Sequence, residues 1–255
     1  MARQRTPEGP PPPPAVQKIR LRYAKRGRLR FSSTRDFQRA LERALRRAGV
    51  PMAYSAGFHP HPKISYANAA PTGTASEAEY FEISVTEPVD PARVAAALDE
   101  ALPHGLDVLE AADALPGSLA DRLQASEWIV ELRGLDDDER AQVERTVAAF
   151  LLAGSVEISR MTKSGNRTFD VRSAVLGLDL EGAGERAAAS GVTVSADAQL
   201  LRVLLRHTTP TVRPDDVIAA LAATGEGLPQ VTPLMTRLVQ GPWSDADATV
   251  GDPLR

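Results

Sequence analysis

The clearest periodic pattern in the chain predicts a helix that begins near Ser33 and ends before Gly49. Its apolar residues recur at intervals of three and four positions, which is the spacing of one buried helical face. Ser33 or Thr34 is a suitable N-cap, and Gly49 followed by Pro51 ends the helix. The apolar stripe consists of Phe37, Ala40, Leu41, Ala44, Leu45 and Ala48.

Alternating apolar and polar positions predict strands around this helix. Ile19, Leu21 and Tyr23 alternate with basic residues, which predicts a strand at 17–24. Leu29 and Phe31 also alternate with arginines, which favours a continuation of that strand or a short hairpin. The pattern then predicts a strand at 79–86, a helix capped by Asp90 with Pro91 in its first turn, and a strand at 106–110. We interpret this succession as a ferredoxin-like βαββαβ domain, of which the pattern locates one of the two strands between the helices.

A similar pattern begins again near Ser126. Trp128, Val130 and Leu132 alternate, and an acidic first turn then opens a long helical segment. The elements predicted after this first strand are a helix at 136–153, a hairpin of strands 156–162 and 167–171, strands at 192–195 and 200–207, and a helix at 214–223. We therefore expect an α+β protein with two ferredoxin-like (βαββαβ) domains in tandem. The expected organisation is a disordered proline-rich leader at 1–16, a basic domain at 17–112, a second domain at 125–240 and a disordered acidic tail at 241–255.

The composition excludes several classes of chemistry. The chain contains no cysteine, so it has no thiolate nucleophile, no disulfide and no cysteine-ligated zinc or iron–sulfur cluster of its own. It has no GxxxxGK[ST], GxGxxG or HExxH motif, which argues against an ATPase, a nicotinamide enzyme or a zinc protease. No apolar run approaches the length of a membrane span. We expect a cytoplasmic protein without a metal or a cofactor.

Charge is distributed very unevenly. Residues 18–63 contain thirteen Lys or Arg against two acids, a net charge of +11, although the whole chain has a net charge of −3. Such a patch predicts a polyanionic ligand, most simply RNA, and salt-dependent binding. The alternative is an internal arrangement of ion pairs between the basic and acidic parts of the chain. The residues expected to contact nucleic acid are Arg28, Arg30, Arg35, Arg39, Arg43, Arg46, Arg47, Arg160, Lys163 and Arg167.

The segment that follows the basic helix contains the best catalytic candidates. It reads GFHPHPK and includes His59, His61 and Lys63. A histidine beside a lysine could perform acid–base chemistry on a ribose hydroxyl and its phosphate without a metal, assisted by Tyr54. The alternative is that these side chains only contact phosphates or make structural hydrogen bonds. The other two histidines, His104 and His207, are expected to be structural.

The combination of RALERALRRAG with YSAGFHPHPKIS resembles the radical SAM-linked protein family, whose uncharacterised members occur beside a radical SAM enzyme or fused to its C-terminal side. The resemblance is strong over residues 18–86, and it implies either a partner, which could be a separately encoded radical SAM enzyme, or a genomic association alone. The same stretch is more distantly similar to the tandem ferredoxin-like endoribonucleases that process CRISPR repeats, which implies that His59 or His61 is an acid–base residue and Lys63 its helper. The glycine-rich C-terminal loop of that group is absent here.

Three functions are therefore compatible with the sequence. The first is an RNA-binding accessory module that acts with a separate RNA-modifying or RNA-processing enzyme. The second is a metal-independent endoribonuclease with a His/Lys acid–base pair. The third is a protein–protein adaptor for an acidic partner.

Overall fold

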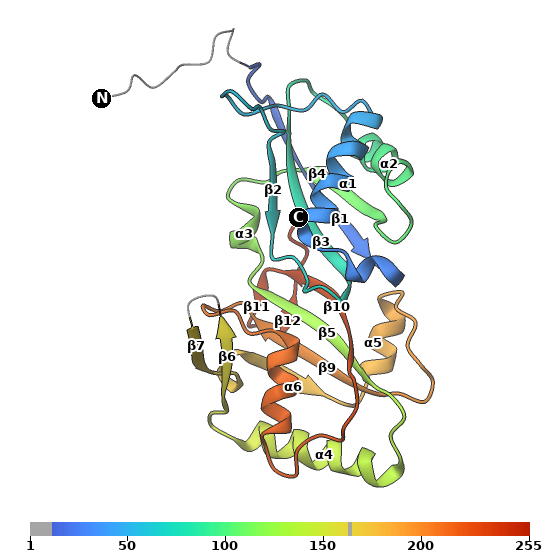
Figure 1. Ribbon diagram of the computed structural model, residues 1–255, viewed down its shortest axis with the longest axis vertical. Helices are drawn as coiled ribbons and strands as arrows, with labels where there is room; N and C mark the ends of the chain where they lie inside the picture. Colours follow the sequence, from blue (N-terminus) through green and yellow to red (C-terminus); the bar gives the residue numbers. More distant parts are fainter. Residues whose placement is uncertain (1–11, 163–164) are drawn as a thin grey trace, which may run out of the picture. The chain divides into compact units, whose positions relative to one another are not determined.

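A computed structural model describes residues 12–162 and 165–255 of the chain. Contacts between Cα atoms divide them into two compact units. Unit 1 runs to Arg122 and includes Leu254–Arg255, and unit 2 is Leu123–Pro253. Each unit contains an antiparallel sheet with helices (Figure 1), so the predicted α+β class is confirmed. In the described part of the chain, no helix is both long enough and apolar enough to cross a membrane.

Unit 1 is built on four strands in the spatial order β4-β1-β3-β2, and each neighbouring pair is antiparallel. Its elements in chain order are β1 (Gln17–Lys25), the 3-10 helix η1 (Gly27–Phe31), α1 (Thr34–Arg47), β2 (Ile64–Ala67), β3 (Ala75–Val85), α2 (Pro91–Ala101), β4 (Val108–Asp113) and the short α3 (Leu119–Arg122).

The core of unit 1 lies between its sheet and the helices α1 and α2, which cover one face of it (Figure 1). Phe37 and Leu41 of α1 and Leu98 of α2 pack there with Leu21 of β1 and Phe81 of β3. The last two residues are also direct partners in the β1–β3 register. The sequence prediction of α1 and its buried stripe is therefore confirmed.

The ends of α1 follow from its cap residues. The Ser33 Oγ accepts a hydrogen bond from the Asp36 backbone N–H, and the Asp36 carboxylate accepts one from the Ser33 backbone N–H, each at 3.2 Å. This capping box satisfies two donors that the first turn would otherwise leave unpaired. At the other end Gly49 has φ +64, a left-handed conformation that favours glycine and stops the helix.

Unit 2 repeats the strand order of unit 1 with additional elements. Its sheet has the order β10-β5-β9-β8, again with antiparallel neighbours. The elements in chain order are β5 (Ala125–Leu132), α4 (Asp137–Leu152), β6 (Glu157–Thr162), β7 (Gly165–Asp170), the 3-10 helix η2 (Arg172–Ala174), β8 (Val175–Asp179), α5 (Ala183–Ala189), β9 (Gln199–Arg206), α6 (Pro214–Ala222), β10 (Leu234–Gly241), β11 (Trp243–Ser244) and β12 (Thr249–Val250).

Two predicted strands are wrong. Leu29 and Phe31 belong to the 3-10 helix η1, because the left-handed Gly27 (φ +53) turns the chain and the Ser32 N–H bonds back to the Leu29 carbonyl at 3.0 Å. The segment 192–195 forms no strand. Its Val192 packs against the apolar cluster beneath α5, which explains the apolar pattern without any strand pairing.

The structure describes the two chain ends to different extents. The predicted leader at 1–16 lies outside the described residues up to position 11. The predicted disordered tail at 241–255 instead contains the paired strands β11 and β12, and Leu254 is buried. Trp243 pairs with Val250, and burial of the Leu254 side chain removes apolar surface from water, so both contacts stabilise an ordered end.

Candidate nucleic-acid interface

Helix α1 presents a cationic surface opposite its buried stripe. Arg35, Arg39, Arg43, Arg46 and Arg47 are all exposed. At about 100° per residue, they fall within about one third of the helix circumference. The sequence therefore arranges guanidinium groups along the whole outer side of the helix, and the two at its C-terminal end also suit the helix dipole. We call these five residues the α1 arginine face.

The α1 arginine face is not neutralised by carboxylates. Among the described residues, none of its five side chains lies within ion-pair distance of an Asp or Glu. Arg47 alone makes a hydrogen bond, from Nη1 to the Ala101 carbonyl at 3.2 Å. Asp36 lies on the same helix, and its pKa is lowered by hydrogen bonds from Ser33 and, to a smaller extent, by Arg39 and Arg35.

The cations of β1 behave differently, because they are paired within unit 1. Arg20 is 1% exposed and donates from Nε to Oε2 of Glu82 at 2.9 Å. Lys18 contacts the other oxygen of Glu82 at 3.1 Å, and Arg22 is 3.6 Å from Glu110. The +11 of residues 18–63 therefore overstates the charge available to a ligand, and the predicted alternative of internal ion pairs holds for β1.

The turn after β1 contains three arginines. Arg26 is paired with carboxylates, whereas Arg28 and Arg30 differ in exposure. Arg26 is bound by Glu77 and, at 2.8 Å, by Asp107, and these carboxylates raise the pKa of its guanidinium. Arg28 is exposed. Arg30 is half-buried, and its guanidinium carbon lies 4.8 Å from the centre of the Phe31 ring. Of the two arginines predicted here to contact nucleic acid, Arg28 is the more accessible.

Residues 52–63 form an ordered ribbon, which we call the histidine loop. Met52 pairs with Val85 at the end of β3, and the Ala53 N–H donates to the Ser84 carbonyl at 2.8 Å. The loop then pairs with itself, because the Ser55 N–H donates to the His61 carbonyl at 2.8 Å and the His61 N–H donates to the Ser55 Oγ at 3.0 Å. In Figure 1 the loop projects from the end of unit 1 at which α1 terminates.

The histidine loop presents its functional groups to solvent. Tyr54, His59, His61 and Lys63 are exposed, as is Phe58 at 61%. Among the described residues, the side chains of His59, His61 and Lys63 make no hydrogen bond or ion pair. The predicted His/Lys pair is therefore not assembled in advance by contacts between its members, and its catalytic role stays a prediction.

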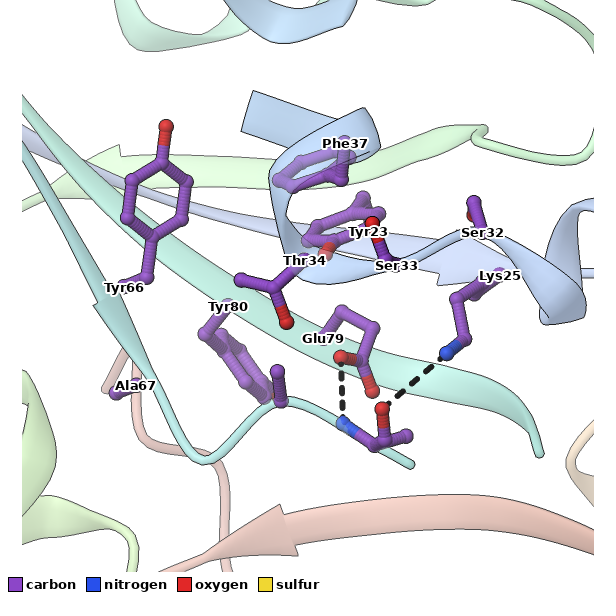
Figure 2. A pocket seen from close by; sticks show the side chains of 12 residues that line it. Tyr23, Lys25, Ser32, Ser33, Thr34, Phe37, Tyr66, Ala67, Glu79 and Tyr80 are labelled. Carbon is purple, nitrogen blue, oxygen red and sulfur yellow. Dashed lines mark hydrogen bonds between the residues drawn. The ribbon is translucent and has the colours of Figure 1, made fainter. Parts of the chain in front are cut away.

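A small pocket lies below the first turn of α1 (Figure 2). Lys25 and Glu79, both buried, hold the main chain at its rim. The Lys25 ammonium donates to the carbonyls of Ala70 and Pro71 at 3.2 and 3.1 Å, and the Ala70 N–H donates to the Glu79 carboxylate at 3.0 Å. The enclosed volume of about 20 Å³ admits roughly one water molecule. The pocket anchors the segment before β3 and is too small for a nucleotide.

The second predicted basic cluster is largely engaged in structure. Arg160 of β6 pairs with the buried Asp216, donates to the Thr211 carbonyl at 3.1 Å and lies 5.0 Å from the Phe169 ring. Arg167 is exposed on β7, directly opposite Arg160 in the register. The predicted hairpin is confirmed, whereas Lys163 lies outside the described residues. Of the two described members of this cluster, Arg167 is the one displayed in the way that an RNA contact requires.

The structure also contains buried ionic and polar groups that sequence reasoning did not locate. Glu127 accepts hydrogen bonds from Arg186 at 2.7 Å and from Arg202 at 2.6 Å, and these arginines lower the pKa of its carboxyl against the opposing effect of burial. His207 is structural, as predicted, since its two ring nitrogens bond to the Leu123 carbonyl and the Ser126 Oγ. The described residues contain no group of three or more His, Asp or Glu side chains placed to hold a metal ion.

Comparison with known proteins places the chain in a family. The model of a family described as "Uncharacterized protein conserved in bacteria" matches residues 18–214, which include α1, the histidine loop and most of unit 2. No curated protein matches the chain. The family description names no reaction, ligand or partner, so the radical SAM association and the similarity to CRISPR-processing nucleases stay expectations.

Proposed function

The chain belongs to this bacterial family, DUF2344, and we propose that it is an RNA-binding accessory protein that acts with a separate RNA-modifying or RNA-processing enzyme. The observation that supports this proposal most directly is the contrast between two groups of cations in unit 1. Lys18, Arg20 and Arg22 of β1 are paired with Glu82 and Glu110, while the five arginines of α1 are exposed and have no carboxylate partner among the described residues.

This contrast matters because only unpaired cations can contribute counterion release. A phosphate that binds an exposed arginine displaces condensed ions into bulk solvent, which favours binding at low salt. A phosphate that approaches Arg20 would first have to break a buried ion pair, at a large cost in free energy. Guanidinium groups also bind phosphates through two parallel hydrogen bonds, which makes an arginine face better suited to this task than a lysine face.

The histidine loop extends the proposed surface. It leaves the C-terminal end of α1 and carries Lys63 and two exposed imidazoles that can donate hydrogen bonds to phosphates. Arg28 before α1 and Arg167 on β7 are the other exposed arginines that we include as phosphate contacts. We do not assign Arg160 to the interface, because Asp216 and Thr211 occupy its donors.

We further propose that both units are ferredoxin-like domains in tandem, at 17–112 and 125–240. The strand orders β4-β1-β3-β2 and β10-β5-β9-β8 support this proposal, since the first, second, third and fourth strands of a βαββαβ motif occupy the order 4-1-3-2 in each case. In unit 2 the hairpin β6–β7 and the helix α5 are then insertions into the motif. The fold does not by itself imply a reaction.

The proposal is tested by fluorescence anisotropy of labelled RNA with the full-length chain at several salt concentrations. We expect binding at low salt, with a logarithm of the association constant that decreases linearly with the logarithm of the salt concentration. Absence of binding even at low salt would end the proposal. Binding to an acidic protein that survives nuclease treatment, without any RNA binding, would instead favour the adaptor function. Recovery of a radical SAM enzyme with the tagged protein would identify the expected partner.

A further inference from the structure

The aromatic residues of the basic region fall into three structural groups. Tyr23 is buried and stacks on Phe37, with ring centroids 4.1 Å apart and planes within 5° of each other. Tyr66 meets Phe37 edge-on at 6.1 Å and is half-buried. These rings pack in or against the core of unit 1.

The second group is Phe31, in η1 before α1. It is 58% exposed, but Arg30 lies over its ring at 4.8 Å. One ring face is therefore occupied by a guanidinium group in a cation–π contact. A base could reach only the remaining face.

The third group is on the histidine loop, where Phe58 is 61% exposed and Tyr54 is 38% exposed. Neither ring contacts another aromatic ring or a cation among the described residues. The loop that carries them is paired with itself and with the end of β3, and Pro60 and Pro62 restrict it further. Phe58 is thus an exposed aromatic side chain on an ordered ribbon, and no other ring or cation among the described residues stacks on it.

We propose that the histidine loop binds unpaired bases, with Phe58 stacking on a base while the α1 arginine face binds the adjoining phosphates, so that the ligand is single-stranded RNA. This inference rests on the function proposed above. The cationic helix favours a polyanionic ligand, and the accessible Phe58 ring favours a single-stranded one. In a duplex the base faces are already covered by neighbouring bases, whereas unpaired bases can stack on an aromatic side chain.

Charge complementarity selects this occupant over an apolar protein surface. The loop follows directly after a helix whose outer side is lined with guanidinium groups, and its own exposed neighbours of Phe58 are His59, His61 and Lys63. An apolar partner would have to desolvate these groups without compensation. A nucleotide offers a π-face to Phe58 and a phosphate to the cations in the same ligand.

The test compares a single-stranded oligouridylate with an RNA duplex, each about 12 nucleotides or base pairs long, bound to the full-length chain at one salt concentration. We expect the wild type to prefer the single strand. Phe58→Ala should weaken binding of the single strand about tenfold and leave duplex binding unchanged. Phe58→Leu keeps an apolar side chain without a π-face and should resemble Phe58→Ala, while Phe58→Trp should restore binding.

Phe58→Trp also supplies a direct readout. Stacking on a base should change the fluorescence of the new indole when the single strand is added, beyond any change in the wild type with its native Trp128 and Trp243. Leu152→Ala is the matched control, because Leu152 is an 88% exposed apolar residue at the end of α4 in the other unit, and it should have no effect.

The outcomes of these experiments distinguish failure of this inference from failure of the proposed function. If no RNA binds at low salt, the proposed function fails and this inference fails with it. If RNA binds in a salt-dependent manner but Phe58→Ala binds the single strand as tightly as the wild type, only the stacking inference is overturned. Equal wild-type affinity for duplex and single strand would overturn it as well.

Discussion

Arg20 of β1 and Glu82 of β3 face each other in the strand register and form an ion pair with 2.9 Å between Nε and Oε2. The Arg20 side chain is completely buried, and its Nη2 also donates to the Gly117 carbonyl at 2.6 Å. This pair shows that part of the basic stretch serves the fold of unit 1. It also leaves the exposed arginines of α1 as the cations available to a ligand.

Removal of one partner of this pair should destabilise the protein strongly. Arg20→Met leaves Glu82 with only the exposed Lys18 as a partner, and loss of one member of a buried pair costs about 3–5 kcal/mol in the free energy of unfolding. Replacement of both charges, in Arg20→Met with Glu82→Leu, should recover much of that loss. Urea denaturation followed by circular dichroism measures both effects.

The exposed pair between Arg145 and Glu226 in unit 2 provides the control. Removal of this ion pair should change the urea midpoint of unfolding too little to resolve, since exposed ion pairs contribute little to the free energy of unfolding. A midpoint for Arg20→Met as close to the wild type as that of the control variant would show that Arg20 is not a structural cation.

The sequence predicted α1 almost to the residue, because its signals are local. A capping serine, an apolar stripe of one period and a terminal glycine all lie within about five turns of helix. Strands β1 and β5 were predicted for the same reason, from their own alternation. The 3-10 helix η1 was missed because four alternating residues fit a strand and a tight turn equally well.

The pairing of cations was not predictable in the same way. Arg20 and Glu82 are separated by 62 positions, and they meet only because β1 pairs with β3 in a particular register. Strands β2, β8 and β10 and helix α5 were also missed. The segment around β8 and α5 contains Gly177, Gly182 and Gly184 and lacks a strong period, so its structure depends on tertiary packing.

The stability of unit 2 should fall at acidic pH through His207. Its Nδ1–H donates to the Leu123 carbonyl, and its Nε2 accepts from the Ser126 hydroxyl, whose oxygen in turn accepts from the Trp128 indole at 2.8 Å. This chain of hydrogen bonds fits the neutral ring. Burial lowers the pKa of His207 below its ordinary value of 6.5.

The sign of the pH effect follows from proton counting. The unfolded state binds a proton at a higher pH than the folded state, so the His207 contribution is complete above about pH 6.5 and is lost as the pH falls towards the lowered folded pKa. Chemical denaturation between about pH 8 and pH 5 should show this decline. His207→Asn should have a flatter profile over the same range, and an unchanged profile would contradict this role.

The histidine loop should bind RNA without cleaving it. Small structured RNAs incubated in EDTA with wild type and with His61→Ala should remain intact in both samples, because no contact within the loop aligns His61 with Lys63 for proton transfer. Gel electrophoresis of the products provides the measurement. Cleavage by the wild type that His61→Ala abolishes would establish the endoribonuclease alternative.

The most direct measurement of the central claim is the salt dependence of RNA affinity for two charge-matched variants. Arg39→Gln with Arg43→Gln removes two cations from the α1 arginine face, and Arg140→Gln with Arg145→Gln removes two from α4, where they bind the Asp197 carbonyl and Glu226. For single strands each lost phosphate contact lowers the slope of log Kd against log salt by about 0.7. We predict a slope lower by about 1.4 for the α1 variant and an unchanged slope for the α4 variant. Equal slopes for the two variants would show that the α1 arginine face is not the RNA-binding surface.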